Sequence, residues 1–157
     1  RIPQAQLNEI DIRTLDKYFA IVDDMESIAD DADDIAELIE NRQENKLKFS
    51  SDAQATIQEV YTKVCNVLDR TLELIETDDL EIAAEILEVE KELDKMQIQF
   101  RHDSISRIKG SDKDRCDPNS GIILLELLDD LEHVSDQMAD IAHSVIEIYE
   151  EENERAV

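Results

Sequence analysis

Residues 23–36 read DDMESIADDADDIA, and residues 129–142 read DDLEHVSDQMADIA. The two segments align without a gap at an offset of 106 residues, and 7 of their 14 positions are identical. In both, apolar side chains recur every three to four residues, the spacing that places them on one face of an α-helix. The chain therefore contains the same amphipathic helix pattern twice, which favours an internal duplication over chance.

The composition favours long helices and excludes several classes of protein. The 157 residues are 41% hydrophobic, enough for one core, yet include only 2 Gly and 2 Pro. This is too little for the tight turns of a β-sheet or for a glycine-rich phosphate loop. A formal net charge of −25 repels nucleic acid phosphates and anionic lipids. The charge favours cations or a basic protein as partners, with a halophilic origin as the plainer explanation.

Cellular location is only broadly indicated by the sequence. Cys65 and Cys116 form no C-x-x-C pair, which favours a reducing cytosol over a disulfide framework or a zinc site. No stretch approaches the roughly 18 consecutive apolar residues of a membrane-spanning helix, and no signal peptide is recognisable. Because the chain begins with Arg1 instead of Met, we expect a piece of a longer protein.

The apolar periodicity predicts an all-α fold, in which residues 1–157 form a single domain. We expect an antiparallel bundle of four long helices with each apolar stripe buried against its neighbours. Ser51, with Gln54 three residues later, is predicted to cap the second helix, and residues 110–120 have the composition of a surface loop. The stripe of the first helix comprises Ile21, Met25, Ile28, Ala32, Ile35 and Ile39. The four helices are predicted at 9–43, 52–76, 79–109 and 120–153.

Acidic residues form a column on each copy of the repeated helix. With a rotation of about 100° per residue, both columns are predicted to face outward, away from the core. An outward acidic face is most simply a solvated surface. However, like charges four residues apart on a helix cost a few tenths of a kcal/mol per pair. Hard metal ions, which prefer oxygen ligands, would relieve this repulsion. The first column comprises Asp23, Glu26, Asp30, Asp33, Asp34 and Glu37, and the second comprises Asp129, Glu132, Asp136 and Asp140.

The sequence does not indicate an enzyme. A di-iron carboxylate site needs inward Glu residues and E-x-x-H motifs, and none of the three histidines lies three residues after a glutamate. His102, His133 and His143 are interpreted as exposed polar residues, although His143 continues the second acidic column. Binding is therefore favoured over turnover.

The acidic segments resemble a known family. Residues 25–36, MESIADDADDIA, and 131–142, LEHVSDQMADIA, are similar to the paired E-x-x-x-D helices of PhoU, the phosphate-uptake regulator. Residues 90–94, EKELD, resemble the acidic motif on the family's preceding helix. The resemblance covers nearly the whole chain. Residues 100–121 look most like the PhoU-like domain at the C-terminus of bacterial sodium/phosphate cotransporters, with the stand-alone phosphate-transport accessory proteins as a second candidate.

The resemblance implies a fold and a set of metal ligands. Family members contain two three-helix units, of which this chain would hold the last helix of the first and all of the second. Some members bind metal ions at the acidic motifs. The family's histidine after the motif aspartate is replaced by Asp31 and Gln137, which shifts the expectation towards all-oxygen coordination of divalent or trivalent ions. The implied ligands are Glu26, Asp30, Glu90, Asp94, Glu132 and Asp136, with Asp34 and Asp140 in place of the family's asparagines.

Two functions follow as hypotheses. The first is a regulatory or accessory domain of phosphate transport that binds metal ions through its acidic motifs. It is expected in the cytoplasm at the inner face of the cell membrane. Its partner would be a membrane phosphate transporter or the transmembrane part of the same protein, with self-association left open. The second is a structural bundle whose acidic face docks a basic partner without metal.

Overall fold

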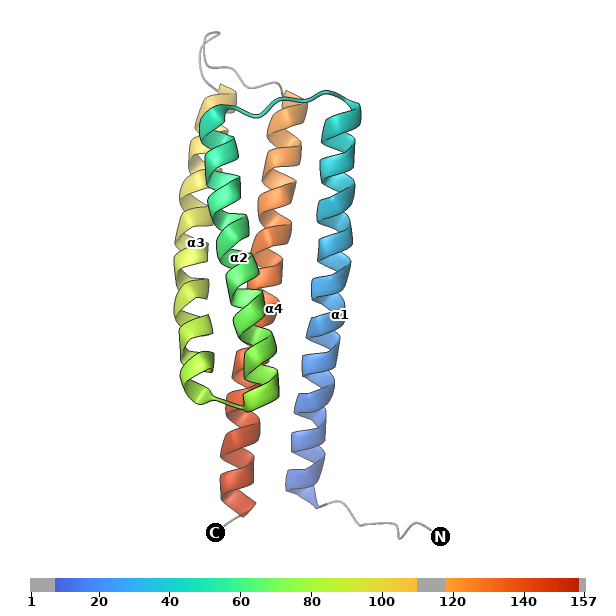
Figure 1. Ribbon diagram of the computed structural model, residues 1–157, viewed down its shortest axis with the longest axis vertical. Helices are drawn as coiled ribbons and strands as arrows, with labels where there is room; N and C mark the ends of the chain where they lie inside the picture. Colours follow the sequence, from blue (N-terminus) through green and yellow to red (C-terminus); the bar gives the residue numbers. More distant parts are fainter. Residues whose placement is uncertain (1–7, 110–117, 156–157) are drawn as a thin grey trace.

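The computed structural model describes residues 8–109 and 118–155. They form four helices: α1 (Glu9–Glu44), α2 (Ser51–Thr77), α3 (Leu80–Lys109) and α4 (Pro118–Arg155). Successive helices run in opposite directions, so the chain forms an up-down-up-down bundle (Figure 1). The predicted all-α fold is confirmed, and every helix boundary lies within two residues of its predicted position. Residues 110–117 of the predicted loop lie outside the described residues, whereas Pro118–Ser120 already belong to α4.

Local side-chain contacts determine where the helices begin. The predicted cap of α2 was wrong by one residue: the Ser50 hydroxyl accepts a hydrogen bond from the Ala53 backbone amide at 3.2 Å, and Gln54 donates to the Phe49 carbonyl instead. Asn8 caps α1 in a reciprocal pair with Asp11. These contacts satisfy amides that have no partner within the first helical turn.

Most of the hydrophobic core lies between α2, α3 and α4, and Ile21 of α1 joins it. Leu74 of α2, Ile86 of α3 and Met138 of α4 are almost fully buried, and α4 contacts both other helices. In contrast, α1 contacts α4 alone among the described helices (Figure 1). The prediction that the stripe of the first helix is buried was therefore wrong in part, since Met25 and Ala32 are exposed. The reason is that these side chains point away from α4, the one helix beside α1.

The surface that α1 packs against α4 is not uniformly apolar. Its positions recur at alternating three- and four-residue spacing, the repeat of paired long helices. Polar residues occupy several of them, including the buried Asp31. The positions are Thr14, Lys17, Ile21, Asp24, Ile28, Asp31, Ile35, Leu38 and Arg42, of which all are buried or half-buried. We call this set the α1–α4 seam.

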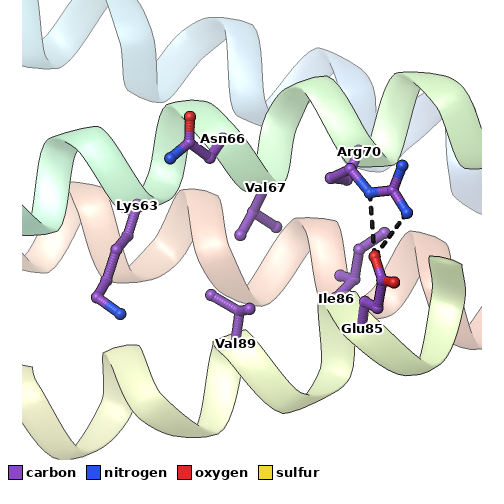
Figure 2. Close-up of a pocket in the computed structure, with 7 residues that line it drawn as sticks. All are labelled: Lys63, Asn66, Val67, Arg70, Glu85, Ile86 and Val89. Atoms are coloured by element: carbon purple, nitrogen blue, oxygen red, sulfur yellow. Dashed lines mark hydrogen bonds and ion pairs between the residues drawn. The ribbon is translucent and has the colours of Figure 1, made fainter.

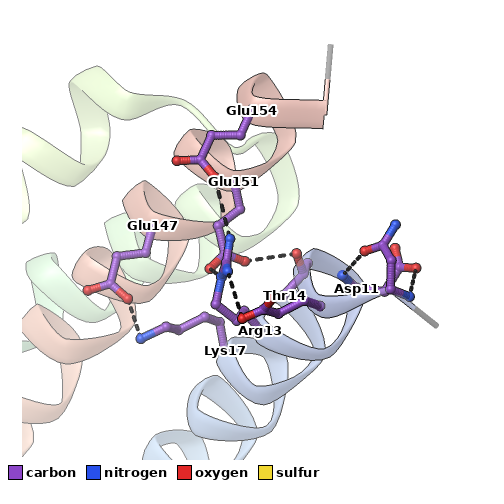
Figure 3. A network of polar contacts seen from close by, with 9 residues as sticks. Asp11, Arg13, Thr14, Lys17, Glu147, Glu151 and Glu154 are labelled. Carbon is purple, nitrogen blue, oxygen red and sulfur yellow. Dashed lines mark hydrogen bonds and ion pairs between the residues drawn. The ribbon is translucent and has the colours of Figure 1, made fainter. Parts of the chain in front are cut away.

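Ion pairs join the N-terminal part of α1 to the C-terminal part of α4. Glu151 of α4 accepts hydrogen bonds from Arg13 Nε and from the Thr14 hydroxyl, both at 3.0 Å (Figure 3). One turn away, Lys17 pairs with Glu147, and the negative carboxylate raises the pKa of the lysine. These contacts fix the antiparallel register of α1 on α4.

No helix among the described residues is long and apolar enough to cross a membrane.

Candidate metal centre

An acidic cluster lies where α3 passes α4. Glu90 and Asp94 are four residues apart on α3, and so share one face of that helix. Because α4 runs antiparallel, Asp136 lies opposite them. One carboxylate oxygen from each of these three residues lies within 4.8 Å of the others. Glu132, one turn before Asp136, adds a fourth carboxylate, and the charges of Asp136 and Asp94 raise its pKa further after burial. These four residues are called the α3–α4 cluster.

Partial burial and repulsion between carboxylates raise the pKa of three residues in the cluster. For Glu90, Glu132 and Asp136, burial is the largest cause, and neighbouring carboxylates add to it. Asp94 acts on all three, which places its charge at the centre of the group. The carboxyl groups of Glu90, Glu132 and Asp136 are therefore harder to ionise than in water, because their charged forms have lost solvent and gained like-charged neighbours. A bound cation would remove both costs.

Two polar side chains of α3 border the cluster at one end. The buried Gln97 donates a hydrogen bond from its amide to Glu132, and Arg101 pairs with Asp129. The positive charge of Arg101 also lowers the pKa of Glu132 and so offsets part of the repulsion. Lys91 and His143 act similarly on Glu90. No described side chain donates a hydrogen bond to all three of Glu90, Asp94 and Asp136. The space between these carboxylates thus remains free for a cation.

The outward orientation predicted for the second acidic column was wrong in part. Glu132 is half-buried and lies against α3 instead of pointing into solvent. A helical wheel gives a direction around the helix's own axis, and here the neighbouring α3 occupies that direction. Asp136 and Asp140 are exposed, as predicted. Asp140 lies at the edge of the group, where it raises the pKa of both Asp136 and Asp24.

The predicted ligands of the first column do not join the α3–α4 cluster. Glu26 and Asp30 are exposed on α1, which contacts neither α2 nor α3 among the described residues. Asp34 lies instead in an open groove of about 310 Å³ between α1 and α4. Its other acidic lining residues are Glu37, Glu126 and Asp130. Burial, followed by the charges of Asp31 and Asp34, raises the pKa of Asp130.

A contact between Asp31 and His133 was missed by the sequence analysis. The histidine was expected to be exposed, and its side chain is 54% exposed, but its Nδ1 lies 2.8 Å from the buried Asp31 carboxylate. The signal was present in the spacing: Asp31 lies three residues after Ile28 and four before Ile35, on the α1–α4 seam.

A second groove lies between α2 and α3, with a volume of about 240 Å³. Figure 2 shows Lys63 and Arg70 of α2 at its two ends, with Val67 and Val89 between them and Ile86 beside Glu85. Both cations are already paired: Arg70 with Glu85 at 2.6 Å and Lys63 with Glu92 at 3.0 Å. An anionic ligand would have to displace these carboxylates, so neither cation of this groove is free to bind one.

The donor set of the α3–α4 cluster fits a hard metal ion. Glu90, Asp94 and Asp136 supply carboxylate oxygens only, the ligands preferred by Mg²⁺, Ca²⁺, Mn²⁺ and Fe³⁺. No thiol or imidazole among the described residues belongs to the three-residue group, which disfavours ions that select sulfur or nitrogen.

Comparison with known proteins gives one family. The family model described as "PhoU domain" matches residues 57–145, which is more than half of the chain and includes the whole α3–α4 cluster. Searches of curated proteins and of solved structures gave no match.

Proposed function

The chain belongs to the PhoU domain family, and on this premise we propose that it is a regulatory domain of phosphate transport that binds a hard metal ion at the α3–α4 cluster. The family is associated with the regulation of phosphate transport. The role in phosphate transport follows from the family, whereas metal binding is argued from this chain's own residues.

One observation carries the metal proposal. Oxygens of Glu90, Asp94 and Asp136 lie within 4.8 Å of one another and come from two different helices. Acidic clusters on surfaces are common, but most spread their charges into solvent. Here partial burial opposes ionisation, and the charges of neighbouring carboxylates reinforce that effect. A divalent or trivalent ion bound by these three residues, with Glu132 beside them, would supply the missing positive charge.

The proposed mechanism is binding, without turnover. Glu90 and Asp94 belong to α3, whereas Asp136 belongs to α4, so an ion held by both would link the two helices. It would also reduce the negative charge presented to a partner. Neutralisation of a charged face biases docking by changing the electrostatic free energy of one state relative to the other. Free phosphate would be repelled by a net charge of −25 unless a metal ion lay between them.

The proposed partner is a membrane phosphate transporter. The resemblance of residues 100–121 to cotransporter C-terminal domains favours the transmembrane part of the same protein, with the domain at the inner face of the cell membrane. The stand-alone accessory proteins give the second version, in which the transporter is a separate chain. Inspection of the native gene separates the two, because only the first requires membrane-spanning segments in the same reading frame.

The competing function is a bundle that docks a basic partner through its acids without metal. The exposed Glu26 and Asp30 of α1 favour it, because they have the family motif but no facing carboxylates among the described residues. The two functions make different demands on the α3–α4 cluster. A metal site requires carboxylates that converge on one ion, whereas docking of a basic surface does not.

Metal uptake tests the proposal. Metal-free protein is titrated with Mn²⁺ and Ca²⁺ by calorimetry, and bound metal is counted by elemental analysis after gel filtration. We expect saturable binding in the wild type and its loss in Glu90→Gln/Asp94→Asn. The matched control is Glu26→Gln/Asp30→Asn, which makes the same chemical change to the same motif on α1. The control should bind metal as the wild type does. Equal binding by all three proteins, or none by the wild type, would refute the metal site and leave the docking function.

A further inference from the structure

The second half of α3 reverses the charge of the chain. Residues 95–109 contain four basic residues and one acidic residue, a net charge of +3. The other 142 residues have a net charge of −28. The exposed side chains of this segment would therefore attract a partner of opposite charge to one that binds the acidic columns.

The exposed side of this part of α3 carries a stripe of cations and isoleucines. Its positions recur at four- and three-residue spacing, so they lie along one side of the helix over about 21 Å. Leu93 and Phe100, from the same turns, are buried against the neighbouring helices, and the stripe faces away from them. The stripe residues, all exposed, are Lys91, Lys95, Ile98, His102 and Ile105, and we call them the basic stripe.

Few carboxylates neutralise the lysines of the basic stripe. Lys95 forms no ion pair among the described residues. Lys91 lies 3.6 Å from Glu88, in a pair whose side chains are both mostly exposed, and such surface pairs are weak. Glu92 is the exposed acid between the two lysines, but it already pairs with Lys63 of α2 at 3.0 Å. The positive charge of the stripe is therefore available to a partner.

The rest of the basic stripe combines one engaged acid with exposed apolar side chains. Asp103 accepts a hydrogen bond from the Gln99 amide at 3.0 Å and lies 3.4 Å from His102 Nδ1. Ile98 is 67% exposed, and Ile105 is 39% exposed. Isoleucine beside lysine, whose long apolar stem can extend its charge to the water, is typical of a helix at a membrane surface.

We propose that the basic stripe of α3 is a contact surface for a membrane of anionic phospholipids. Lipid phosphates would pair with Lys91 and Lys95, and Ile98 and Ile105 would enter the boundary between head groups and acyl chains. The helix would lie along the membrane surface without crossing it, as amphipathic helices with a basic side do. The proposal requires neither a bound metal ion nor a transport partner.

The net charge of −25 does not prevent contact through this side of the molecule. In about 0.15 M salt, charges are screened over about 8 Å. The first acidic column belongs to α1, and α1 and α3 form opposite flanks of the bundle without contact between them (Figure 1). A membrane against the basic stripe would therefore meet the lysines directly and the acids of α1 only through a screened field.

Nucleic acid and free phosphate fit the basic stripe less well than lipid does. The stripe contains no aromatic side chain on which a base could stack. Free phosphate would use the lysines but leave both isoleucines in water. A phospholipid surface supplies both kinds of contact, phosphate for the lysines and apolar chains for the isoleucines.

Cosedimentation of the purified chain with lipid vesicles tests the proposal. The buffer is free of divalent metal, because such an ion could bridge the acidic columns to anionic lipid. We expect binding to vesicles of equal parts phosphatidylglycerol and phosphatidylcholine, and none to phosphatidylcholine alone. Lys91→Gln/Lys95→Gln should lower the partition coefficient about fivefold or more, since each cation near an anionic membrane contributes about a factor of five. The matched control, Lys46→Gln/Lys48→Gln, removes two exposed lysines between α1 and α2 and should bind as the wild type does.

A tryptophan reporter locates the contact, because the chain contains no tryptophan of its own. In Ile98→Trp, the fluorescence should shift to shorter wavelength on anionic vesicles and should be quenched by brominated acyl chains. Val22→Trp places the same reporter on α1, at a position that is 58% exposed, and should show neither change. Equal shifts at both positions would contradict a contact through α3.

Several outcomes would overturn the proposal. They include no binding of the wild type to anionic vesicles, and equal binding by Lys91→Gln/Lys95→Gln. Loss of binding in the Lys46→Gln/Lys48→Gln control would place the contact at the end of the bundle instead. Inorganic phosphate should compete no better than chloride at equal ionic strength, and specific competition would identify free phosphate as the occupant. Tighter binding to duplex DNA than to anionic vesicles would assign the stripe to nucleic acid. None of these results bears on the metal site, which is tested without lipid.

Discussion

The Nδ1 atom of His133 on α4 lies 2.8 Å from the carboxylate Oδ2 of Asp31 on α1. Asp31 is buried in the α1–α4 seam, where an unpaired carboxylate would be costly. On its other side, the His133 ring faces the Gln137 amide at 3.1 Å. The hydrogen bond to Asp31 raises the pKa of His133, and this effect exceeds that of burial, which lowers it. The pair therefore links the docking of α1 to the protonation of one histidine.

Stability should fall as pH rises through the folded-state pKa of His133. That pKa lies above the ordinary value of 6.5, so the folded protein binds the proton more tightly than the unfolded chain. The stabilisation is fully present below about pH 6.5 and is lost as the histidine deprotonates. Because the His133 side chain is 54% exposed, solvent screening should keep the change below about 1 kcal/mol.

Urea unfolding at about pH 6 and pH 8.5 measures this effect. His133→Gln should reduce the difference between the two pH values. His102→Gln removes a histidine whose side chain is 77% exposed, and should leave the difference unchanged. The same pH dependence in His133→Gln and the wild type would show that the pair does not contribute.

Removal of one charge from the α3–α4 cluster should stabilise the metal-free protein. The folded-state pKa of Asp136 is raised by burial and by Asp94, so folding is opposed once the carboxyl ionises, above its ordinary pKa of 3.8. Asp136→Asn should increase the free energy of unfolding at neutral pH by a few tenths of a kcal/mol, a small value because the residue is exposed. The gain should disappear near pH 3, where the wild-type carboxyl is neutral in both states.

In excess metal, the wild type should become more stable than Asp136→Asn. A ligand that binds only the folded state at about 100 times its dissociation constant adds about 2.7 kcal/mol. The wild type should therefore gain stability from Mn²⁺ or Ca²⁺, while Asp136→Asn gains much less. Asp33→Asn, which alters an exposed acid of α1, serves as the control for general ionic effects. Equal stabilisation of all three proteins would argue against a site at Asp136.

The sequence predicts the helices well because their periodicity is local information. Few glycines and prolines interrupt the pattern, so all four helices lie where expected. The error at Ser50 and Ser51 has an equally local cause, because two adjacent serines offer the same capping oxygen. The family resemblance implied Glu90, Asp94, Glu132 and Asp136 as motif carboxylates but not which of them meet, and the antiparallel packing of α3 on α4 brings these residues together.

The burial of α1 is harder to predict, for a geometric reason. Its apolar residues belong to two stripes: the α1–α4 seam, and an exposed outer stripe that includes Leu15, Val22, Met25 and Ala32. A helical wheel reports only the average direction of the two. Ile21 and Ile28 face α4, whereas Met25 and Ala32 belong to the outer stripe. The average also hides Asp31, which is one more acid in an acidic run in the sequence but is buried in the structure. Only the position of α4 separates the two stripes.

Loss of the Glu151 charge should loosen the start of α1 without affecting α2 and α3. Glu151 is 13% exposed and binds both Arg13 and Thr14. Glu151→Gln should cost about 1 kcal/mol, because it weakens a charge-assisted contact in a partly buried position. Hydrogen exchange should increase in residues 9–20 alone. Glu154→Gln is the control, since Glu154 is 66% exposed and makes a longer contact of 3.4 Å to Arg13. Uniform exchange changes along the chain would contradict a local role.

The two copies of the repeat should respond differently to the same loss of volume. Leu131 is 3% exposed in the core of α2, α3 and α4, so Leu131→Ala should cost about 2–5 kcal/mol in residues 1–157. Its counterpart Met25 is 43% exposed on the outer stripe, and Met25→Ala should change the free energy of unfolding by about 0.5 kcal/mol or less. Urea unfolding of both variants gives the comparison. A large cost of Met25→Ala would contradict the exposed position of this side chain.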